Sequence, residues 1–308
     1  DDTDTDMQPD IVWIKNRDAT DPHCLFDAVR GVTKVIHPNL ESGGEETTDA
    51  DTLTSFDSDG FALGADVKVN TNTEKYVAWC WKANGAGSAN AVGSITTTAT
   101  SANTTSGVSI VKYTGTGSEA TIGHGTGIVP KFILTRNYTE VRDWLPNHTG
   151  FANLQGRSYF NDNATEYNET DAYGDTANTS SVWEVLTDIK VNGSSKDYIS
   201  YLFGDVQGFA KHGSFEGNGN ADGTFVYTGF RPAWVMTKSI DSTSNWQIFD
   251  NQREGYNVDN DELLGNDNTA EATTDMIDLL SNGFKLRIAT DPNVAETYLY
   301  SAFAEAPF

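Results

Sequence analysis

The chain has 308 residues, of which 37% are hydrophobic and 11% aromatic, and 44 acidic against 20 basic side chains give a net charge of −24. The aromatic content is too high for a disordered chain, and the length is typical of two or three domains. The negative charge disfavours nucleic-acid and anionic-membrane partners, and no apolar run reaches the roughly 18 residues of a membrane span. The high negative charge favours solubility in a salty medium, where ions screen the repulsion between like charges.

The chain opens with an acidic segment, residues 1–6, that leads directly into the first expected strand. No secretion signal is visible, and the first residue is Asp1 rather than methionine. We interpret the sequence as a mature or trimmed product, or as a piece of a longer polypeptide.

The first expected strand follows a proline, and its pattern occurs three times. Pro9-Asp-Ile-Val-Trp-Ile-Lys15 returns as Pro130-Lys-Phe-Ile-Leu-Thr-Arg136 and as Pro232-Ala-Trp-Val-Met-Thr-Lys238, at spacings of 121 and 102 residues. Proline is tolerated at the first position of a strand because no ladder hydrogen bond is needed there. Each copy therefore predicts a strand that begins at or just after its proline.

A second pattern closes each copy. Tyr76-Val-Ala-Trp-Cys-Trp81 matches Tyr198-Ile-Ser-Tyr-Leu-Phe203 and Tyr298-Leu-Tyr-Ser-Ala-Phe303, at spacings of 122 and 100 residues. These spacings agree with those of the first pattern within two residues. We therefore infer three diverged tandem repeats.

A third pattern occurs only twice. Tyr113-Thr-Gly-Thr-Gly117 matches Phe215-Glu-Gly-Asn-Gly219, and each begins 17 residues before the next proline. Only eight residues precede Pro9, so the first repeat lacks this leading segment. The segment either lies in sequence removed upstream or is supplied by another subunit through strand addition.

The apolar runs are short and bounded by Gly, Asn, Asp, Ser and Thr, which predicts strands and turns. We expect an all-β fold in which each repeat is a small antiparallel β-sandwich of jelly-roll or immunoglobulin-like size. Val77, Trp79 and Trp81 should share one strand face, and one short helix is expected around residues 271–280. In the second repeat we expect strands over 109–113, 120–122, 131–136, 143–145, 158–160, 182–186 and 198–203.

The same landmarks predict the domain organisation. Residues 1–86 form repeat 1, which lacks its leading strands, and residues 107–206 and 207–308 form repeats 2 and 3. Between the first two lies a Gly/Ser/Thr-rich linker, residues 87–106, in which we expect one strand.

A search for chemistry yields no catalytic, cofactor-binding or metal-binding residue, and we predict no enzyme activity. The histidines stand at no metal-ligand spacing, and no carboxylate pair is singled out for acid–base work; the five are His23, His37, His124, His148 and His212. Cys24 and Cys80 are interpreted as reduced core residues, with a disulfide between them as the alternative.

Loops that superficially resemble binding motifs are better explained as turns. The run Asp57-Ser-Asp-Gly60 and the corresponding Ser281-Asn-Gly283 are rich in turn formers. The run Asn218-Gly-Asn-Ala-Asp-Gly223 lacks the closing glutamate of a calcium loop. The sequence therefore gives little reason to expect calcium binding there. The paired glycines of the third pattern are interpreted as hairpin glycines with positive φ.

The repeated phrases are similar to those of a known family. Thr54-Ser-Phe-Asp-Ser-Asp-Gly-Phe61, Val108-Ser-Ile-Val-Lys-Tyr-Thr-Gly-Thr-Gly117 and Tyr227-Thr-Gly-Phe-Arg-Pro-Ala233, with the first two patterns, resemble repeat-containing proteins of marine bacteriophages. Those proteins are described as tail-fibre-like or virion structural proteins. The resemblance runs from Pro9 to the end of the chain, implies a virion location and host-surface contact, and supplies no catalytic residues.

Together these observations predict an extracellular or virion-borne structural subunit of a tail fibre or appendage. Its expected partners are further copies of itself, other virion proteins and host surface glycans. One alternative is a filament subunit assembled by strand donation. Another is a carbohydrate-active enzyme on a sandwich scaffold, for which no acid–base pair can be named.

Overall fold

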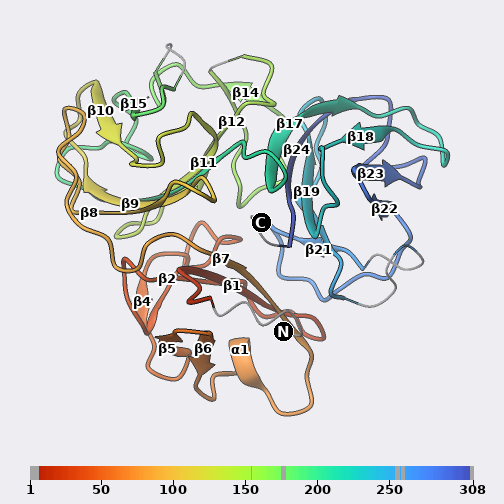
Figure 1. Cartoon of the computed structure of the whole chain (residues 1–308), viewed down its shortest axis with the longest axis horizontal. Coiled ribbons are helices and arrows are strands. Elements are labelled where there is room, and N and C mark those ends of the chain that lie inside the picture. Colours follow the sequence, from red (N-terminus) through yellow and green to blue (C-terminus); the bar gives the residue numbers. More distant parts are fainter. Residues whose placement is uncertain (1–6, 154, 175–177, 254–256, 258–260, 306–308) are drawn as a thin grey trace.

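The computed structural model describes residues 7–153, 155–174, 178–253, 257 and 261–305. Its strands form small antiparallel sheets grouped into three lobes around a common centre (Figure 1). Lobe 1 comprises β1 to β7, lobe 2 comprises β8 to β16 and lobe 3 comprises β17 to β24. The all-β prediction is confirmed. Within the described part of the chain, no helix has the length and apolar character required to cross a membrane.

Lobe 1 is built on a three-stranded sheet with the order β2-β1-β7. The central strand β1 alternates side chains between the lobe's own core and the centre of the molecule, and all six of its residues are buried. Two hairpins and a single-turn helix complete the lobe. Its elements are β1 (Ile11–Asn16), β2 (Cys24–Asp27), β3 (Lys34–Val35), β4 (Thr47–Thr48), β5 (Leu53–Asp57), β6 (Gly60–Leu63), α1 (Val67–Asn70) and β7 (Tyr76–Trp81).

Lobe 2 has a five-stranded sheet with the order β12-β11-β16-β9-β8, covered by the pair β10-β15. The residues between these two layers form a separate apolar core around Trp183. The elements are β8 (Ala99–Asn103), β9 (Val108–Thr114), β10 (Ala120–Gly123), β11 (Pro130–Asn137), β12 (Leu145–His148), β13 (Gly156–Arg157), β14 (Tyr167–Asn168), β15 (Val182–Val185) and β16 (Asp197–Gly204).

Lobe 3 repeats this two-layer plan, with a five-stranded sheet β17-β24-β19-β20-β21 against a three-stranded sheet β18-β23-β22. Its own core lies between the layers. The elements are β17 (Ala210–Glu216), β18 (Phe225–Tyr227), β19 (Trp234–Ser239), β20 (Gln247–Asp250), β21 (Leu263–Leu264), β22 (Ile277–Leu280), β23 (Gly283–Leu286) and β24 (Thr297–Phe303).

Two local predictions were wrong. The helix expected around residues 271–280 is absent, and β22 instead pairs with β23 through Leu279 opposite Phe284. The strand expected over 158–160 is displaced to Gly156–Arg157, where it pairs with β14. In both places pairing with a following strand overrides the local preference. The strand expected in the 87–106 linker is present as β8, which pairs with β9.

The central strand pairs of the three lobes have one common register. Ile11 lies opposite Trp81, Phe132 opposite Phe203 and Trp234 opposite Phe303. At the other end of each pair Asn16, Asn137 and Ser239 lie opposite a tyrosine. The three-repeat interpretation stays a prediction, and this shared register favours it.

The faces of these strand pairs meet in one aromatic core at the centre of the molecule. Trp81, Phe203 and Phe303 come from corresponding positions of the three lobes, and their ring centroids lie 6.0, 5.7 and 5.4 Å apart in edge-to-face arrangements. Edge-to-face pairs add about 0.5–1.5 kcal/mol each beyond the burial of their area. The lobes are therefore parts of one folded unit.

Around this core, each lobe is linked to the next by one hydrogen-bonded pair of side chains, and the three pairs lie at corresponding positions. The Tyr201 hydroxyl donates to Asp27 at 2.6 Å, joining lobe 2 to lobe 1. Ser301 and His148 lie in hydrogen-bond contact at 3.2 Å, joining lobe 3 to lobe 2. The Trp79 indole donates to Asp250 at 2.9 Å, which joins lobe 1 to lobe 3 and closes the ring.

A second set of links uses the backbone alone. The amides of Glu46, Glu166 and Glu271 donate to carbonyl oxygens of the neighbouring lobe, at 2.8, 3.0 and 2.9 Å. The acceptors are Tyr138, Ile240 and Arg17, which again lie one in each lobe. Each of the three interfaces therefore contains the same pair of contacts in the same direction around the ring.

We predict that Asp27→Ala strongly destabilises the chain. Asp27 is fully buried, pairs with Arg30 at 2.5 Å and accepts from Tyr201 in lobe 2. Removing it leaves the buried Arg30 guanidinium with Glu46, 3.5 Å away, as its remaining acidic partner. Breaking a buried ion pair in this way typically costs about 3–5 kcal/mol. Asp278→Ala, which breaks a partly exposed pair with Arg287, should cost less than about 1 kcal/mol. Urea unfolding of both variants checks this, and equal losses would contradict it.

We also predict that His212 makes the fold sensitive to mild acid. Burial between lobes 2 and 3 lowers the pKa of His212 to about 3. The unfolded chain therefore takes up a proton near pH 6.5 that the native chain cannot accept, and stability present above that pH is lost as the pH falls toward 3. The His212→Asn variant should lose one histidine's share of this dependence, up to about 1.4 kcal/mol per pH unit below pH 6.5, while the buried His23 and His148 keep theirs. Urea midpoints of both chains at pH 7, 6 and 5 measure it, and parallel curves would contradict it.

Candidate functional site

The free edge of β7 distinguishes lobe 1 from the other two lobes. In lobe 2 the corresponding strand β16 lies between β11 and β9, and in lobe 3 the strand β24 lies between β19 and β17. In lobe 1, β7 pairs with β1 on one side, and no described strand pairs with it on the other. Among the described residues, the position of a leading strand is therefore unfilled, which agrees with the missing third pattern.

The backbone groups that point out from this edge can be assigned from the register. Arg17 donates to the Lys75 carbonyl at 2.8 Å, so the residues of β7 at odd positions direct their backbone groups toward β1. The amides and carbonyls of Tyr76, Ala78 and Cys80 therefore point away from β1. Such an unpaired row is a ready template for another strand.

Burial of the side chains agrees with a missing strand. Ala78 is exposed, and Tyr76 and Cys80 are half-buried. In lobe 2 the corresponding side chains are fully buried, all with 0% exposure (Tyr198, Ser200 and Leu202). In lobe 3 none exceeds 5% exposure (Tyr298, Tyr300 and Ala302). The side chains at this sheet position are therefore exposed to solvent only in the lobe that lacks the neighbouring strand.

Tyr76 also lacks the aromatic partner that its counterparts have. Tyr113 stacks on Tyr198 with centroids 5.2 Å apart, and Phe215 stacks on Tyr298 at the same separation. No ring of the described residues stacks on Tyr76, although its hydroxyl is anchored by donating to the Val67 carbonyl at 2.6 Å. Its ring is thus held in place beside an empty position.

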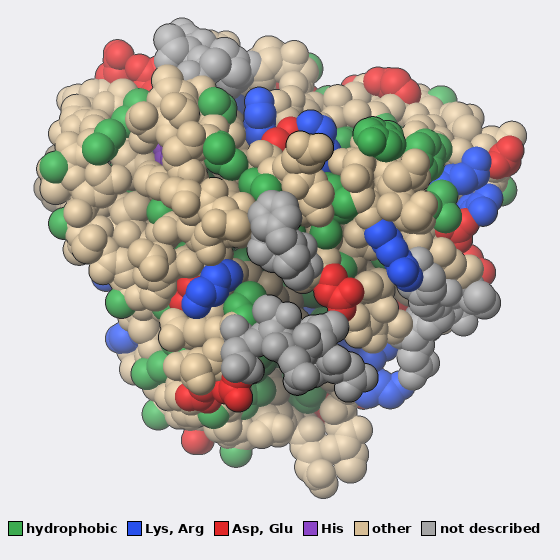
Figure 2. All heavy atoms as spheres, viewed as in Figure 1, with side chains coloured by type: hydrophobic (Ala, Val, Ile, Leu, Met, Phe, Trp, Pro, Cys, Tyr) green, Lys and Arg blue, Asp and Glu red, His purple; other side chains and the backbone are tan. Residues whose placement is uncertain are grey.

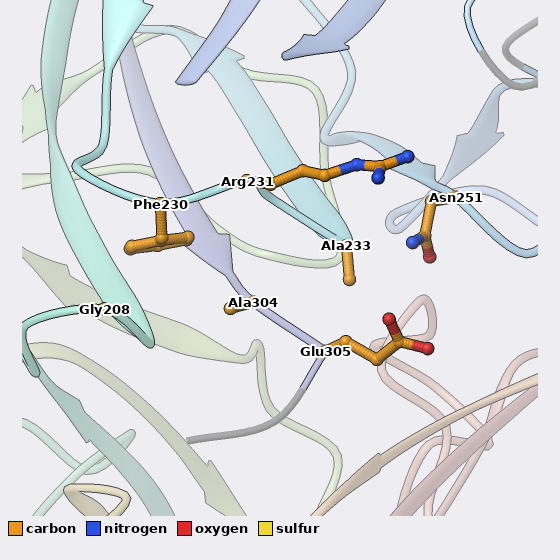
Figure 3. Close-up of a pocket in the computed structure, with 7 residues that line it drawn as sticks. All are labelled: Gly208, Phe230, Arg231, Ala233, Asn251, Ala304 and Glu305. Carbon is orange, nitrogen blue, oxygen red and sulfur yellow. The ribbon is translucent and has the colours of Figure 1, made fainter. Parts of the chain in front are cut away.

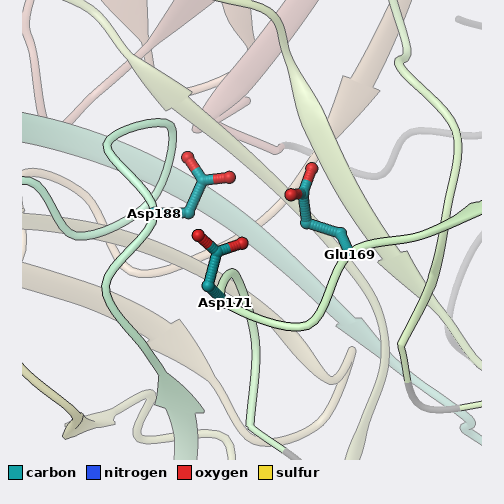
Figure 4. Close-up of side chains that lie close together, drawn as sticks. All are labelled: Glu169, Asp171 and Asp188. Carbon is teal, nitrogen blue, oxygen red and sulfur yellow. The ribbon is translucent and has the colours of Figure 1, made fainter.

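An acidic cluster in lobe 2 was not predicted from the sequence. Glu169, Asp171 and Asp188 bring carboxylate oxygens within 4.8 Å of one another (Figure 4). Lys190 already lies among them, with its ammonium 2.8 Å from Asp188 and 3.4 Å from Glu169. These carboxylates hold the pKa of Lys190 above its usual value despite partial burial. The chain's own Lys190 therefore occupies this cluster and offsets part of its negative charge.

Two of the cavities lined by described residues are large enough to consider as binding sites. One, of about 400 Å³, lies in lobe 3, where Arg231, Asn251 and Glu305 line it (Figure 3). The other, of about 240 Å³, lies beside β12 and is lined by Lys131, Asn147 and the buried Arg157 among others. Arg157 packs its guanidinium over the Tyr173 ring at 4.7 Å. Small-molecule sites typically have volumes of about 300–1,000 Å³. The first cavity lies near the lower end of that range and the second lies below it.

The surface offers one further feature. The edge strand β18 exposes Phe225 by 43% and Tyr227 by 66%, on the same side of the strand, while Val226 between them is buried. On the face seen in Figure 2, hydrophobic side chains are interspersed with polar and charged ones. The sequence analysis missed this pair because alternation marks a strand but not which of its faces is covered.

The histidines and cysteines occupy structural positions. All five histidines are buried, and the ring nitrogens of His23 accept from Trp13 and donate to the Leu264 carbonyl. Cys24 and Cys80 are free thiols. Burial raises the pKa of Cys80 to about 12, which keeps its thiol protonated and unreactive.

The turn interpretations fit the structure. Asp57 and Gly60 flank the turn of the β5–β6 hairpin, and Ser281 and Asn282 form the turn between β22 and β23. In the loop that resembles a calcium motif, Asp222 pairs with Lys285 at 2.7 Å. Of the paired glycines, Gly117 and Gly219 have positive φ as predicted, at 73° and 63°. Gly115 and Gly217 do not, and the prediction was wrong there because close backbone contact requires glycine instead.

We predict that calcium leaves the melting temperature of the wild-type chain unchanged, because the Lys190 ammonium already occupies the space between the carboxylates of Asp188 and Glu169. The Lys190→Gln variant should melt lower in EDTA, since three carboxylates then repel one another. Adding calcium should restore part of that loss. Lys196→Gln, which removes the partner of Glu140 at the surface, is the control and should gain nothing from calcium. A wild-type chain that calcium stabilises would contradict the prediction.

Comparisons with known proteins add a family but no function. No curated protein and no solved structure matches the chain. A family model described as a domain of unknown function, DUF7483, matches residues 2–307. Since this match spans almost the whole chain, the protein belongs to the DUF7483 family.

Proposed function

We propose that this chain is a non-enzymatic structural subunit of a virion appendage, a tail fibre or a related part, which joins its neighbours through the free edge of β7. The observation that carries the proposal is the unfilled strand position beside Ala78. An edge strand with outward backbone groups is an aggregation hazard unless it is blocked or occupied. A regular partner in an assembly provides that occupation.

The closed ring of lobes suits a load-bearing part. Three interfaces with repeated contacts around one aromatic core hold the lobes in fixed relation. Loops and edge strands project outward from this body (Figure 1). The exposed pair Phe225 and Tyr227 is the surface we assign to host glycans, because sugars stack on exposed aromatic rings.

The buried carboxylates support a structural role. Asp261 and Glu271 of lobe 3 both contact Arg17 of lobe 1, at 3.3 and 2.6 Å. Burial and the neighbouring Glu271 raise the pKa of Asp261 to about 6, while the two guanidinium groups of Arg17 and Arg253 hold the pKa of Glu271 below its usual value. This carboxylate pair could be mistaken for an acid–base couple, yet both members lie in an interface between lobes.

The second candidate is a subunit of an extracellular filament, and the same free edge motivates it. There the strand beside β7 would come from another copy of this chain, and a head-to-tail contact that does not close would propagate. The two candidates differ in the source of the strand and in the particle that carries it.

Electron microscopy of the native particle, together with mass spectrometry of purified virions, tests the proposal. We expect the chain among the virion proteins, and a continuous strand beside β7 in the reconstructed appendage. An open filament of this chain alone would favour the second candidate. Absence of the chain from virions of an infecting stock that encodes it would refute the virion proposal.

A further inference from the structure

We propose that the free edge of β7 takes an antiparallel strand of a neighbouring polypeptide, in the register of β9 on β16, with an aromatic side chain of that strand stacked on Tyr76. This inference rests on the proposed function, because it assumes that a neighbour fills the edge. It goes further by stating the sequence pattern that the neighbour must present.

The two filled lobes define the pattern. In lobe 2, Val108 lies opposite Phe203 and Tyr113 opposite Tyr198. In lobe 3, Ala210 lies opposite Phe303, and Phe215 lies opposite Tyr298. The incoming strand should therefore place a small apolar residue opposite Trp81 and, five residues later, an aromatic residue opposite Tyr76.

A glycine completes the pattern two residues after the aromatic position. Gly115 donates to the Lys196 carbonyl at 2.8 Å, and Gly217 donates to the Glu296 carbonyl at 2.9 Å. A Cβ atom at Gly115 would lie 2.5 Å from the Gly193 carbonyl oxygen, so a side chain is excluded there. Glu74 occupies the corresponding place beside β7 and supplies the acceptor carbonyl.

The described residues hold no spare strand with this pattern. The two segments of this pattern, β9 and β17, are already paired in their own lobes. Moving either one would expose the core that it covers, including Tyr113 or Phe215. A neighbouring polypeptide can fill the edge without that loss.

The experiment uses the full chain and a fluorescent peptide with the sequence of residues 106–115, which carries the required pattern. Fluorescence anisotropy measures binding of this peptide and of a Tyr113→Ala version. A peptide of scrambled sequence is the blank. We expect the first peptide to bind and the Tyr113→Ala version to bind roughly tenfold or more weakly, since both the stacking and its buried area are lost.

Two variants of the chain locate the site. Ala78→Pro removes an outward amide that β1 does not use, and so should abolish binding without disturbing the β1–β7 ladder. Ala78→Thr keeps that amide and should bind as the wild-type chain does. Equal melting temperatures of the two variants are the control for folding. If Ala78→Pro melts lower, Tyr76→Ala replaces it, with the same expected loss of aromatic preference.

The outcomes separate this inference from the proposed function. Equal binding of both 106–115 peptides, or binding that survives Ala78→Pro, would overturn the register and the aromatic contact. Failure of every peptide to bind a folded chain would overturn the inference as well. Neither result bears on whether the chain is found in virions, which the mass spectrometry decides separately.

Discussion

Three lobes close around one aromatic core, in which Trp81, Phe203 and Phe303 contact one another. The main sheet of lobe 1 has only three strands. Its inner face is covered because rings from lobes 2 and 3 pack against Trp79 and Trp81. In an open array the terminal unit would need a cap. Here the third unit returns to the first, so each lobe is stabilised by two neighbours.

Closure also explains why buried polar groups are tolerated at the interfaces. Asp27 pairs with Arg30 inside lobe 1, and Asp250 pairs with Arg253 in the same arrangement in lobe 3. Each aspartate then accepts a further hydrogen bond from the next lobe. A buried charge of this kind is costly unless every contact is made, so the polar pairs favour one arrangement of the lobes over others.

The features that could be predicted are those encoded by sequence patterns that occur more than once in the chain. The prolines, the alternating aromatic residues of β7 and the two copies of the leading strand established the all-β class, the strand starts and the gap beside β7. The sequence did not predict which residues join the lobes, because His148 of lobe 2 stands where lobes 1 and 3 have Asp27 and Asp250. The acidic cluster was not predicted for another reason. Lys190 and Glu169 are separated by other elements in the sequence and come into contact only in the folded chain. The helix expected near residues 271–280 failed because a short apolar run does not reveal its pairing partner.

The amide links of Glu46, Glu166 and Glu271 have a consequence for how this family changes over time. Main-chain groups are the same for nearly every amino acid, so an interface closed by them survives substitution of the side chains around it. If the three lobes are diverged repeats, as the sequence predicts, mutation has placed Trp79, Tyr201 and Ser301 at corresponding positions while the geometry has persisted. Relatives of this chain should consequently share the proline and tyrosine landmarks long after their interface side chains have ceased to be comparable.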